Sequence, residues 1–291
     1  MKTILITGVS SGFGKLSLKK ILKAGNLVLA GIRGGEERLY QMAEANSEDR
    51  DILDALKSGR LKGCDLHMDK ADTFSRIHEI LETHFKGKLD VLINNAGYGL
   101  IGPLEAMGPE DIEYQMDVNF NGPALLTKEC LPYLRKSSGR IINISSVLGI
   151  KTLPFYSAYC ASKYALEGFS EALHYELKPF GIDTCLIEPG SFKTKFVEVA
   201  LKQGNSLKTH PAYQARTDKL NELLQNSSRV AGDPDKVASL ITKYVGSKSV
   251  PIRKAVGADG IIMSLVNSFI PNSLYVWSVE FFFRMAVFKG V

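Results

Sequence analysis

The sequence predicts an α/β fold, a doubly wound parallel sheet of about seven strands with helices on both faces. Short apolar runs rich in β-branched residues alternate with longer segments of helical periodicity along most of the 291 residues. This pattern is typical of parallel strands joined by right-handed crossover helices. A glycine-rich turn, Gly8 to Gly14, follows the first apolar run directly. In a later helical segment, Tyr159 and Lys163 stand four positions apart, which places both side chains on one helix face.

Each element is predicted from apolar periodicity and from the turn residues that bound it. Strands are expected at residues 2–7, 26–32, 61–65, 88–94, 139–145, 181–187 and 250–255. Helices are expected at 12–25, 70–86, 110–136, 156–179 and 234–246. The acidic segment 34–59 is expected to form an extra helix or a surface loop. Because no repeat or low-complexity linker interrupts the pattern, residues 1–291 are expected to form a single domain that ends in an apolar helical extension at about 259–291.

The composition, 45% apolar and 23% charged, is ordinary for a globular protein. No secretory signal peptide is apparent, because the short apolar run after Lys2 leads straight into the glycine turn. We therefore expect a cytoplasmic protein. The four cysteines lack C-x-x-C spacing, which predicts reduced thiols and no metal site.

The net charge of +5 is uneven, since residues 191–291 hold fourteen Lys and Arg against seven Asp and Glu. A solvated basic face is favoured over a site for phosphorylated ligands or an anionic membrane surface, because no dense basic run is present. Nothing else in the sequence favours nucleic acid binding.

The glycine turn lies between a predicted strand and a predicted helix. Gly8, Gly12 and Gly14 follow the strand at 2–7 with the spacing G-x-x-x-G-x-G, a variant of the usual dinucleotide fingerprint. Such a turn lets backbone N–H groups approach a pyrophosphate at the positive end of the helix. The alternative is a plain tight turn, which the strand and helix on either side disfavour.

Tyr159 and Lys163 form a candidate acid–base pair. A free Tyr hydroxyl has a pKa of about 10, and a nearby ammonium favours the phenolate and lowers that pKa. The pair could therefore exchange a proton with an alcohol or a ketone. Isolated Tyr–Lys pairs with this spacing also occur on ordinary helix surfaces, so the interpretation depends on further motifs.

Motifs elsewhere in the chain supply that context. Thr7 to Gly14 reads T-G-x-x-x-G-x-G, and residues 94–97 read N-N-A-G at the end of an apolar strand. The other motif residues are Asn119, Ser146 (thirteen positions before Tyr159) and Pro189-Gly190 with Thr194. In these motifs the chain resembles the short-chain dehydrogenase/reductase family in its single-domain form, over about residues 1–260. Residues 159–168 are most similar to the steroid and retinol dehydrogenase branch.

The resemblance implies a Rossmann-like fold and hydride transfer between a nicotinamide and a carbonyl or carbinol carbon, without a metal. It assigns catalysis to Asn119, Ser146, Tyr159 and Lys163. Tyr159 would give a proton in reduction or take one in oxidation, and Ser146 would hydrogen-bond the reacting oxygen. Lys163 would lower the pKa of Tyr159 and bind the nicotinamide ribose. Asn119 would hold a water that links Lys163 to solvent.

The end of the second strand bears on which nicotinamide cofactor is used. An NAD enzyme commonly places Asp or Glu there, but Ile32 and Arg33 occupy the position. An Arg can pair with the 2′-phosphate of NADP, with Ser10 or Ser11 as a further donor, so NADP(H) is favoured over NAD(H). The alternative is that Arg33 is only a surface charge. By resemblance, Asp65 contacts the adenine. The predicted cofactor-binding residues are Thr7, Gly8, Ser10, Ser11, Gly12, Phe13, Gly14, Arg33, Asp65, Leu66, Asn95, Ala96, Gly97, Tyr159, Lys163, Pro189, Gly190, Phe192 and Thr194.

Substrate selection is expected from the segment at about 191–229, a substrate-binding lid that follows the sixth strand. Its apolar wall would contain Phe192, Phe196, Val197, Val199 and Leu201. The cleft is also expected to be lined by Leu148, Leu153, Pro154 and Phe155. An apolar pocket suits a steroid-, retinoid- or lipid-like ketone or secondary alcohol better than a sugar. The predicted substrate residues are Ser146, Leu148, Phe155, Tyr159 and Phe196.

The tail at residues 272–291 is crowded with apolar side chains and holds the only Trp, Trp277. It is too short, and too interrupted by Glu280 and Arg284, for a confident membrane span. Three alternatives are open: a helix packed on the protein's own core, a dimer contact, and an interfacial membrane helix. Core or dimer packing is favoured, because the family commonly ends in helices around its substrate cleft. We also expect a homo-oligomer, a dimer or a tetramer.

The sequence therefore predicts an NADP(H)-dependent oxidoreductase that acts on a hydrophobic ketone or secondary alcohol. One alternative is an NAD-linked alcohol dehydrogenase of the same family that works mainly in the oxidative direction. Another is a catalytically silent regulator that senses NADP(H), which the four intact catalytic positions disfavour.

Overall fold

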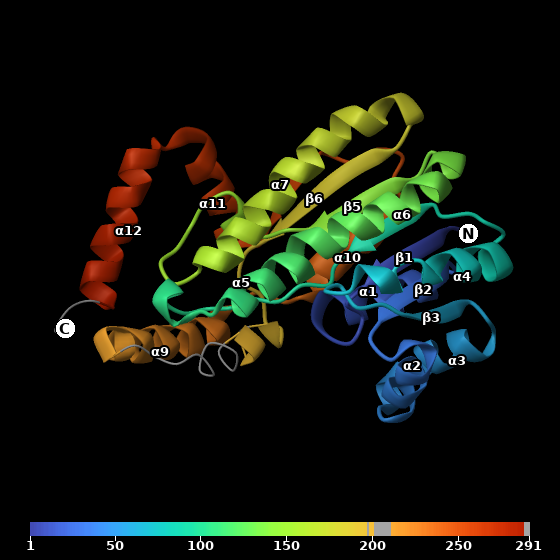
Figure 1. Ribbon diagram of the computed structural model, residues 1–291, viewed down its shortest axis with the longest axis horizontal. Coiled ribbons are helices and arrows are strands. Elements are labelled where there is room, and N and C mark those ends of the chain that lie inside the picture. The colour runs from blue at the N-terminus through green and yellow to red at the C-terminus, as the bar shows by residue number, and fades with distance from the viewer. Residues whose placement is uncertain (197, 201–210, 288–291) are drawn as a thin grey trace.

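The computed structural model describes residues 1–196, 198–200 and 211–287, and it confirms the predicted doubly wound sheet (Figure 1). Within these residues, seven strands pair in the order β3-β2-β1-β4-β5-β6-β7, and all of the pairings are parallel. The strands are β1 Thr3–Thr7, β2 Leu27–Ile32, β3 Leu61–Asp65, β4 Val91–Asn94, β5 Arg140–Ile144, β6 Asp183–Pro189 and β7 Arg253–Val256. Each coincides with a strand expected from the apolar pattern.

The strand order reverses at β1, which pairs with β2 on one side and with β4 on the other. At such a point the connections after neighbouring strands diverge and leave a crevice at the carboxyl edge of the sheet. Here those connections are the glycine turn after Thr7 and the N-N-A-G segment after β4. The topology therefore brings together two motifs that lie far apart in the sequence.

Each face of the sheet has its own apolar core, because successive strand residues point to opposite faces. Ile4 and Ile6 belong to one core and Leu5 to the other, and all three are fully buried. The helices over the first core include α1 (Gly12–Lys23) and α10 (Asp235–Gly246), and those over the second include α4 (Arg76–Phe85), α6 (Gly122–Ser137) and α7 (Ser157–Leu177).

The acidic segment between β2 and β3 forms two short helices, α2 (Gly35–Glu44) and α3 (Arg50–Lys57). The carboxylate of Asp49 is almost completely buried and forms ion pairs with Lys15 and Lys19 of α1. A buried carboxylate is stable only when such partners compensate it. This ion-pair cluster therefore fastens the additional helices to the helix that the glycine turn begins.

The helix expected at 110–136 is not continuous, which corrects the sequence prediction. A π-helical turn, Asp117–Asn121, separates α5 (Pro109–Met116) from α6. The side-chain amide of Asn119 donates hydrogen bonds to the Tyr98 carbonyl (2.9 Å) and the Ser162 hydroxyl (3.0 Å), and its oxygen accepts one from the Tyr98 N–H (3.0 Å). These bonds hold Asn119 toward the neighbouring segments, and a wider turn accommodates that position.

The C-terminal region forms the predicted helical extension. It consists of α11 (Ala258–Phe269) and α12 (Asn272–Ala286), which we call the C-terminal arm. Figure 1 shows the arm projecting beyond the sheet and returning toward α9 (Gln214–Val230). None of the helices in the described ranges is long and apolar enough to cross a membrane.

A pair of glycine substitutions tests the packing of α2 on the sheet. A Cβ on Gly63 would lie 2.4 Å from backbone atoms of Glu36, so Gly63→Ala should lower the free energy of unfolding by about 1–3 kcal/mol. A Cβ on Gly168, in the middle of α7, meets no atom within 4 Å, and Gly168→Ala should raise stability by about 0.5–1 kcal/mol. Urea denaturation of both variants measures the contrast. Equal effects would contradict the close approach of α2 to β3.

Candidate active site

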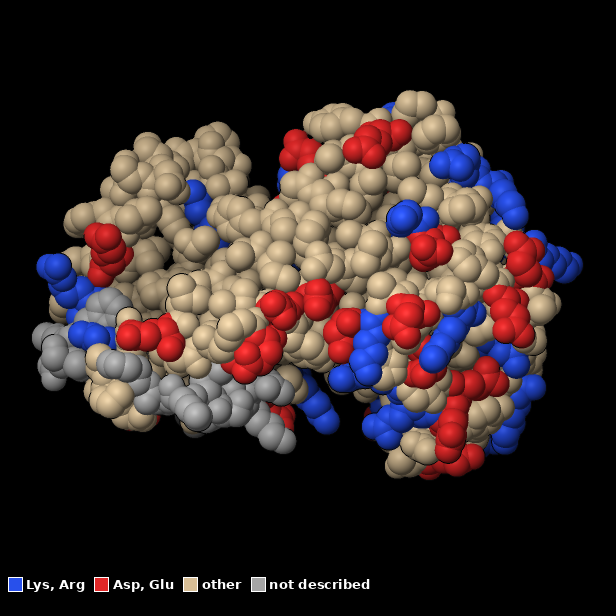
Figure 2. Space-filling view, in the orientation of Figure 1, with Lys and Arg blue, Asp and Glu red and all other residues tan. Residues whose placement is uncertain are grey.

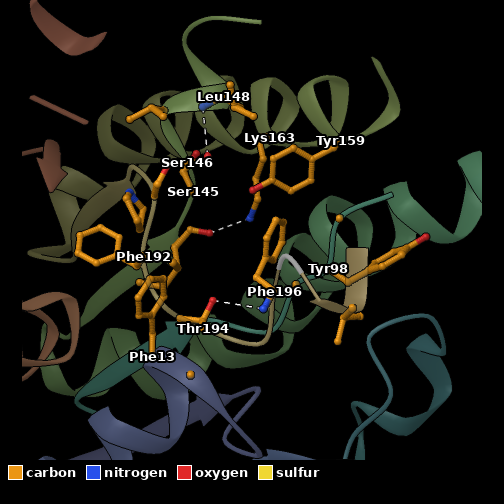
Figure 3. A pocket seen from close by; sticks show the side chains of 18 of the residues that line it. Phe13, Tyr98, Ser145, Ser146, Leu148, Tyr159, Lys163, Phe192, Thr194 and Phe196 are labelled. Carbon is orange, nitrogen blue, oxygen red and sulfur yellow. Dashed lines mark hydrogen bonds between the residues drawn. The ribbon is translucent and has the colours of Figure 1, made fainter. Parts of the chain in front are cut away.

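A cavity of about 1160 Å³ lies at the carboxyl edge of the sheet. It runs from the glycine turn, past the N-terminal part of α7, to the inner side of the C-terminal arm. Figure 3 shows its middle part, where Tyr159 and Lys163 lie on one side of Ser146, Phe196 lies against Tyr159, and Phe192 lies beside Phe13. The cavity therefore has a polar end at the glycine turn and an apolar end at the arm.

At the polar end, the glycine turn is held by side chains from both neighbouring strands. The Thr7 hydroxyl accepts hydrogen bonds from the backbone N–H groups of Asn95 (3.1 Å) and Ala96 (3.0 Å). The Asn95 side chain donates to the carbonyls of Thr7 (2.9 Å) and Gly8 (3.1 Å). A Cβ on Gly14 would lie 2.2 Å from the Gly8 oxygen, so Gly14 permits the tight packing of α1. Residues 10–13, at the start of α1, are left facing the cavity.

Two arginines line the outer part of the polar end. Arg33 follows β2 as predicted, and Arg38 reaches the same place from the first turns of α2. Both side chains are exposed. Sequence reasoning missed Arg38, although Gly34-Gly35 before it signals the sharp turn that brings α2 back over the strand ends.

Asp65 lies beside the turn that follows β2, and its expected contact with the adenine stays a prediction. Its carboxylate accepts hydrogen bonds from the Gly34 N–H (2.8 Å) and from Arg76 (2.6 Å). The Gly34 bond, together with Arg76 and His67, holds the pKa of Asp65 below its usual value. Asp65 thus supports the turn between Arg33 and α2 and lies outside the described lining of the cavity, whereas Leu66 lines it as predicted.

The candidate catalytic side chains come from α7 and from the end of β5. Tyr159 and Lys163 are buried on one face of α7. The Lys163 ammonium donates a hydrogen bond to the Ile144 carbonyl (2.9 Å) and lies 5.9 Å from the centroid of the Tyr159 ring. Ser146 begins the short turn after β5, where its hydroxyl accepts a bond from the Leu148 N–H (3.1 Å). Ser146 is also a hydrogen-bond partner of Tyr159.

Burial controls the protonation of this group. It raises the pKa of the Tyr159 phenol, and the hydrogen bond with Ser146 only partly opposes the rise. Burial also lowers the pKa of Lys163 to about 8, although the charge of Glu167 acts against that shift. The direction for Tyr159 is the reverse of the lowering by Lys163 that the sequence led us to expect, because loss of hydration disfavours the phenolate. At neutral pH, Tyr159 is therefore protonated and neutral.

Asn119 joins segments that surround the Tyr159 and Lys163 side chains. Its bonds to Tyr98 and Ser162 join the segment after β4 to α7. The Ser162 hydroxyl in turn donates to the Tyr159 carbonyl (2.7 Å). Asn119 itself lies outside the described cavity lining, and the water expected at this position stays a prediction.

Most of the predicted site residues line the cavity. Those that do so are Thr7, Gly8, Ser10, Ser11, Gly12, Phe13, Arg33, Leu66, Asn95, Ala96, Gly97, Ser146, Leu148, Tyr159, Lys163, Pro189, Gly190, Phe192, Thr194 and Phe196. Phe155 is not among the described lining residues, and its role as a substrate residue stays a prediction. Its backbone has a φ of 70° and its ring packs against Tyr213 (centroids 6.5 Å apart), while Leu153, also expected there, and Tyr156 line the wall.

The apolar end is built by segments that come together only in the folded chain. Phe196 packs over Tyr159 with 5.4 Å between the ring centroids. The further apolar lining is Val199; Leu220, Leu223 and Leu224 of α9; Met263 and Val266 of α11; and Val279, Phe282 and Phe283 of α12. The Tyr275 hydroxyl donates a hydrogen bond to the Thr152 carbonyl (2.7 Å) and holds α12 beside the cavity. Val197 and Leu201, predicted for the same wall, lie outside the described residues.

The C-terminal arm has two different faces. Its inner face packs on the protein, where Tyr275 and Phe283 are buried, as the core-packing alternative expects. Its outer face exposes large apolar side chains, among them Leu265, Phe269 and Trp277. Figure 2 shows that part of the surface with few charged side chains. Contact of this outer face with a dimer partner or a membrane stays a prediction.

Comparison with known proteins identifies the family. The family model described as short chain dehydrogenase matches residues 2–204, and the chain belongs to this family of oxidoreductases. It is 32% identical to 3-ketodihydrosphingosine reductase of Bacteroides thetaiotaomicron over 97% of this chain and 98% of that protein. It is also 32% identical to bovine (Bos taurus) retinol dehydrogenase 8, over 94% and 88% of the two chains.

Solved structures share the fold. A short-chain dehydrogenase from Streptomyces avermitilis is 29% identical, with a TM-score of 0.74 over 99% of this chain and 98% of that one. A metagenomic short-chain oxidoreductase in complex with NADP is 25% identical, with a TM-score of 0.66 over 88% and 96% of the two chains. A Burkholderia phymatum member in complex with NAD is 22% identical, with a TM-score of 0.70 over 87% and 88%. These neighbours include both nicotinamide cofactors.

Proposed function

We propose that the protein is an NADP(H)-dependent oxidoreductase that transfers a hydride between nicotinamide and a hydrophobic ketone or secondary alcohol. One observation carries the proposal: the buried group of Tyr159, Lys163 and Ser146 lies where the polar and apolar ends of a single cavity meet. A cofactor at one end and an apolar substrate at the other would bring their reacting atoms together beside this group.

The polar end fits a dinucleotide. The first N–H groups of α1 lack carbonyl partners within the helix and carry its positive end. Gly8 and Gly12, at φ of 72° and 53°, leave the turn without side chains that would block a pyrophosphate. Residues 10–13 would hold the phosphates, and Lys163 the ribose beside the nicotinamide. When bound, the cofactor supplies or accepts the hydride.

The protein's own residues would manage the proton. In the reductive direction, Tyr159 holds its proton until negative charge develops on the carbonyl oxygen, and then donates it. Ser146 hydrogen-bonds the same oxygen and orients it. The charged Lys163 stabilises the phenolate that remains. Phe196 covers the phenol and keeps water away from the transfer.

Arg33 and Arg38 support NADP(H) over NAD(H). Both are exposed at the end of the cavity where the adenosine would lie, and β2 ends at Ile32 without the acid typical of NAD enzymes. A guanidinium pairs well with a phosphate. The complexes of the solved neighbours support a nicotinamide cofactor of either kind, so the preference depends on these two arginines.

The apolar end supports an extended, lipid-like substrate. Its walls from α9, α11 and α12 are mostly aliphatic and aromatic, which favours burial of hydrocarbon. The names of the two relatives refer to 3-ketodihydrosphingosine and to retinol, both of which carry a long hydrocarbon part. We therefore propose a long-chain ketone or alcohol as the substrate class.

Turnover with NADPH and a series of ketones of increasing chain length tests the proposed function. The wild type should oxidise NADPH in the presence of long-chain ketones, followed by the absorbance of the reduced nicotinamide. Tyr159→Phe should lower kcat by about 10²–10⁴-fold and still bind NADPH. Tyr156→Phe, which changes the neighbouring phenol of the cavity lining, should keep most of its activity. Near-normal kcat in Tyr159→Phe would refute the assigned proton donor.

Substitution of the two arginines tests the cofactor preference. Arg33→Ala and Arg38→Ala should each weaken NADPH binding by about 10- to 100-fold, as expected for a lost hydrogen bond to a charged group, with little change for NADH. Nicotinamide fluorescence measures both affinities. Arg50→Ala, an exposed substitution on α3, serves as the control. If NADPH and NADH weakened equally, the assignment to a 2′-phosphate would be wrong.

A substitution on α12 tests the site of the substrate chain. Val279 lines the cavity, so Val279→Trp should fill its apolar end, raising KM about tenfold or more for long-chain ketones and little for short ones, because two or more methylene groups lose their burial. Val276→Trp, at an exposed position of the same helix, is the matched control. An equal effect of the two variants would place the chain elsewhere.

A further inference from the structure

Helix α7 carries more ionisable side chains in register than the proposed chemistry uses. Tyr159, Lys163, Glu167 and Glu171 follow one another at intervals of four residues, so they form one stripe along the helix. The first three are buried and Glu171 is half-buried. Glu167 is buried one turn beyond the candidate catalytic lysine, and because burial of a charge is costly, its carboxylate requires compensating partners.

Glu167 belongs to a compact cluster of charges. Its carboxylate accepts a hydrogen bond from the Nε of Arg253 on β7 (3.0 Å), whose Nη2 donates to Glu171 (2.6 Å). The carboxylate of Glu188, at the end of β6, lies 3.7 Å from the same Nε and is almost completely buried. The cluster thus joins α7 to β6 and β7, two neighbouring strands of the sheet.

Close packing fixes Glu167 in this position. A Cβ on Gly149 would lie 2.9 Å from the Ser145 hydroxyl and 3.0 Å from the Cγ of Glu167. No larger residue at position 149 would fit without displacing them. Ser145 directly precedes Ser146 and lines the cavity, and Glu167 lies one turn from Lys163, so the cluster lies directly beside the candidate catalytic group.

We infer that Glu167 is a positioning residue whose carboxylate keeps Lys163 charged and in place beside Tyr159. It acts through Lys163 and does not touch the reacting atoms. Arg253 holds the carboxylate in its buried position, and Glu188 shares that arginine. The inference about catalysis depends on the proposed function, whereas the effect on Lys163 does not.

The groups that face this pair define the expected pH dependence. Lys163 faces Tyr159 and Glu167 on α7 and the Ile144 carbonyl on β5. Glu167 faces Lys163 and Glu171 on its own helix, the like charge of Glu188 on β6 and the opposite charge of Arg253 on β7. Of the charged groups in the cluster, Glu167 is the one that raises the pKa of Lys163 against the effect of burial.

The charges around Lys163 set the direction in which its pKa, and with it the activity, should change. Lys163, with its pKa near 8, is charged below that pH and loses its charge as the pH rises through it. Removal of the Glu167 charge lowers the pKa of Lys163 further. The ammonium is then lost at a lower pH, and activity that depends on it declines earlier on the alkaline side.

The test compares Glu167→Gln with Glu171→Gln. Each removes one carboxylate from Arg253 and from the same helix, but only the first should affect Lys163. The alkaline limb of the pH profile of kcat/KM should move down by about one pH unit in Glu167→Gln and stay in place in Glu171→Gln. Glu167→Asp, which retains the charge, should restore part of the shift.

A direct titration of Lys163 separates this inference from the proposed function. NMR of protein with isotopically labelled lysine, assigned with Lys163→Met, follows the ammonium whether or not a substrate is known. A lower pKa in Glu167→Gln and not in Glu171→Gln supports the inference. An unchanged pKa, or an equal shift in both variants, overturns it. If Glu167→Gln fails to fold, the same titration is made with Glu167→Asp, whose shorter side chain moves the charge away from Lys163. The pKa of Lys163 should then be lowered by a smaller amount. An unchanged pKa in Glu167→Asp would overturn the inference.

Discussion

The burial of Lys163 beside Tyr159 is the constraint on which the site depends. A buried ammonium requires a hydrogen-bond acceptor and a counter-charge. The Ile144 carbonyl supplies the first at 2.9 Å, and Glu167, one turn along α7, supplies the second. Because Ile144 ends β5, Ser146 follows two residues later and reaches the Tyr159 phenol. The position of one lysine therefore sets how α7 lies across the end of the sheet.

The same arrangement divides the cavity into two parts. On one side, the reversal of strand order at β1 places the glycine turn, Arg33 and Arg38 around a polar end. On the other side, α9 and the C-terminal arm add an apolar end that the sheet alone does not provide. The family fold thus supplies the buried Tyr159 group and the polar end, and the later helices of this chain form the apolar end.

Residue spacing predicted those parts of the structure that depend on local geometry. The strands, the glycine turn and the Tyr159–Lys163 pair follow from helical and strand periodicity, and the structure places the pair as expected. The surroundings of Asp65 and Phe155 could not be predicted, because Asp65 is held by Gly34 and Arg76 and the backbone of Phe155 has a positive φ. The positions of Arg38 and of the cavity walls from α9, α11 and α12 are set by tertiary packing between segments that are distant in the sequence. Sequence periodicity does not predict such packing.

The proposed function requires that one cavity takes a phosphorylated nicotinamide dinucleotide at its polar end, next to Tyr159. Titration of the wild-type protein with NADPH and with NADH, followed by nicotinamide fluorescence, measures this binding directly. We expect saturable binding of both, with NADPH tighter by about tenfold or more, or about 1.4 kcal/mol. Equal or tighter binding of NADH would contradict the role of the two arginines, and binding of neither would contradict the proposed function as a whole.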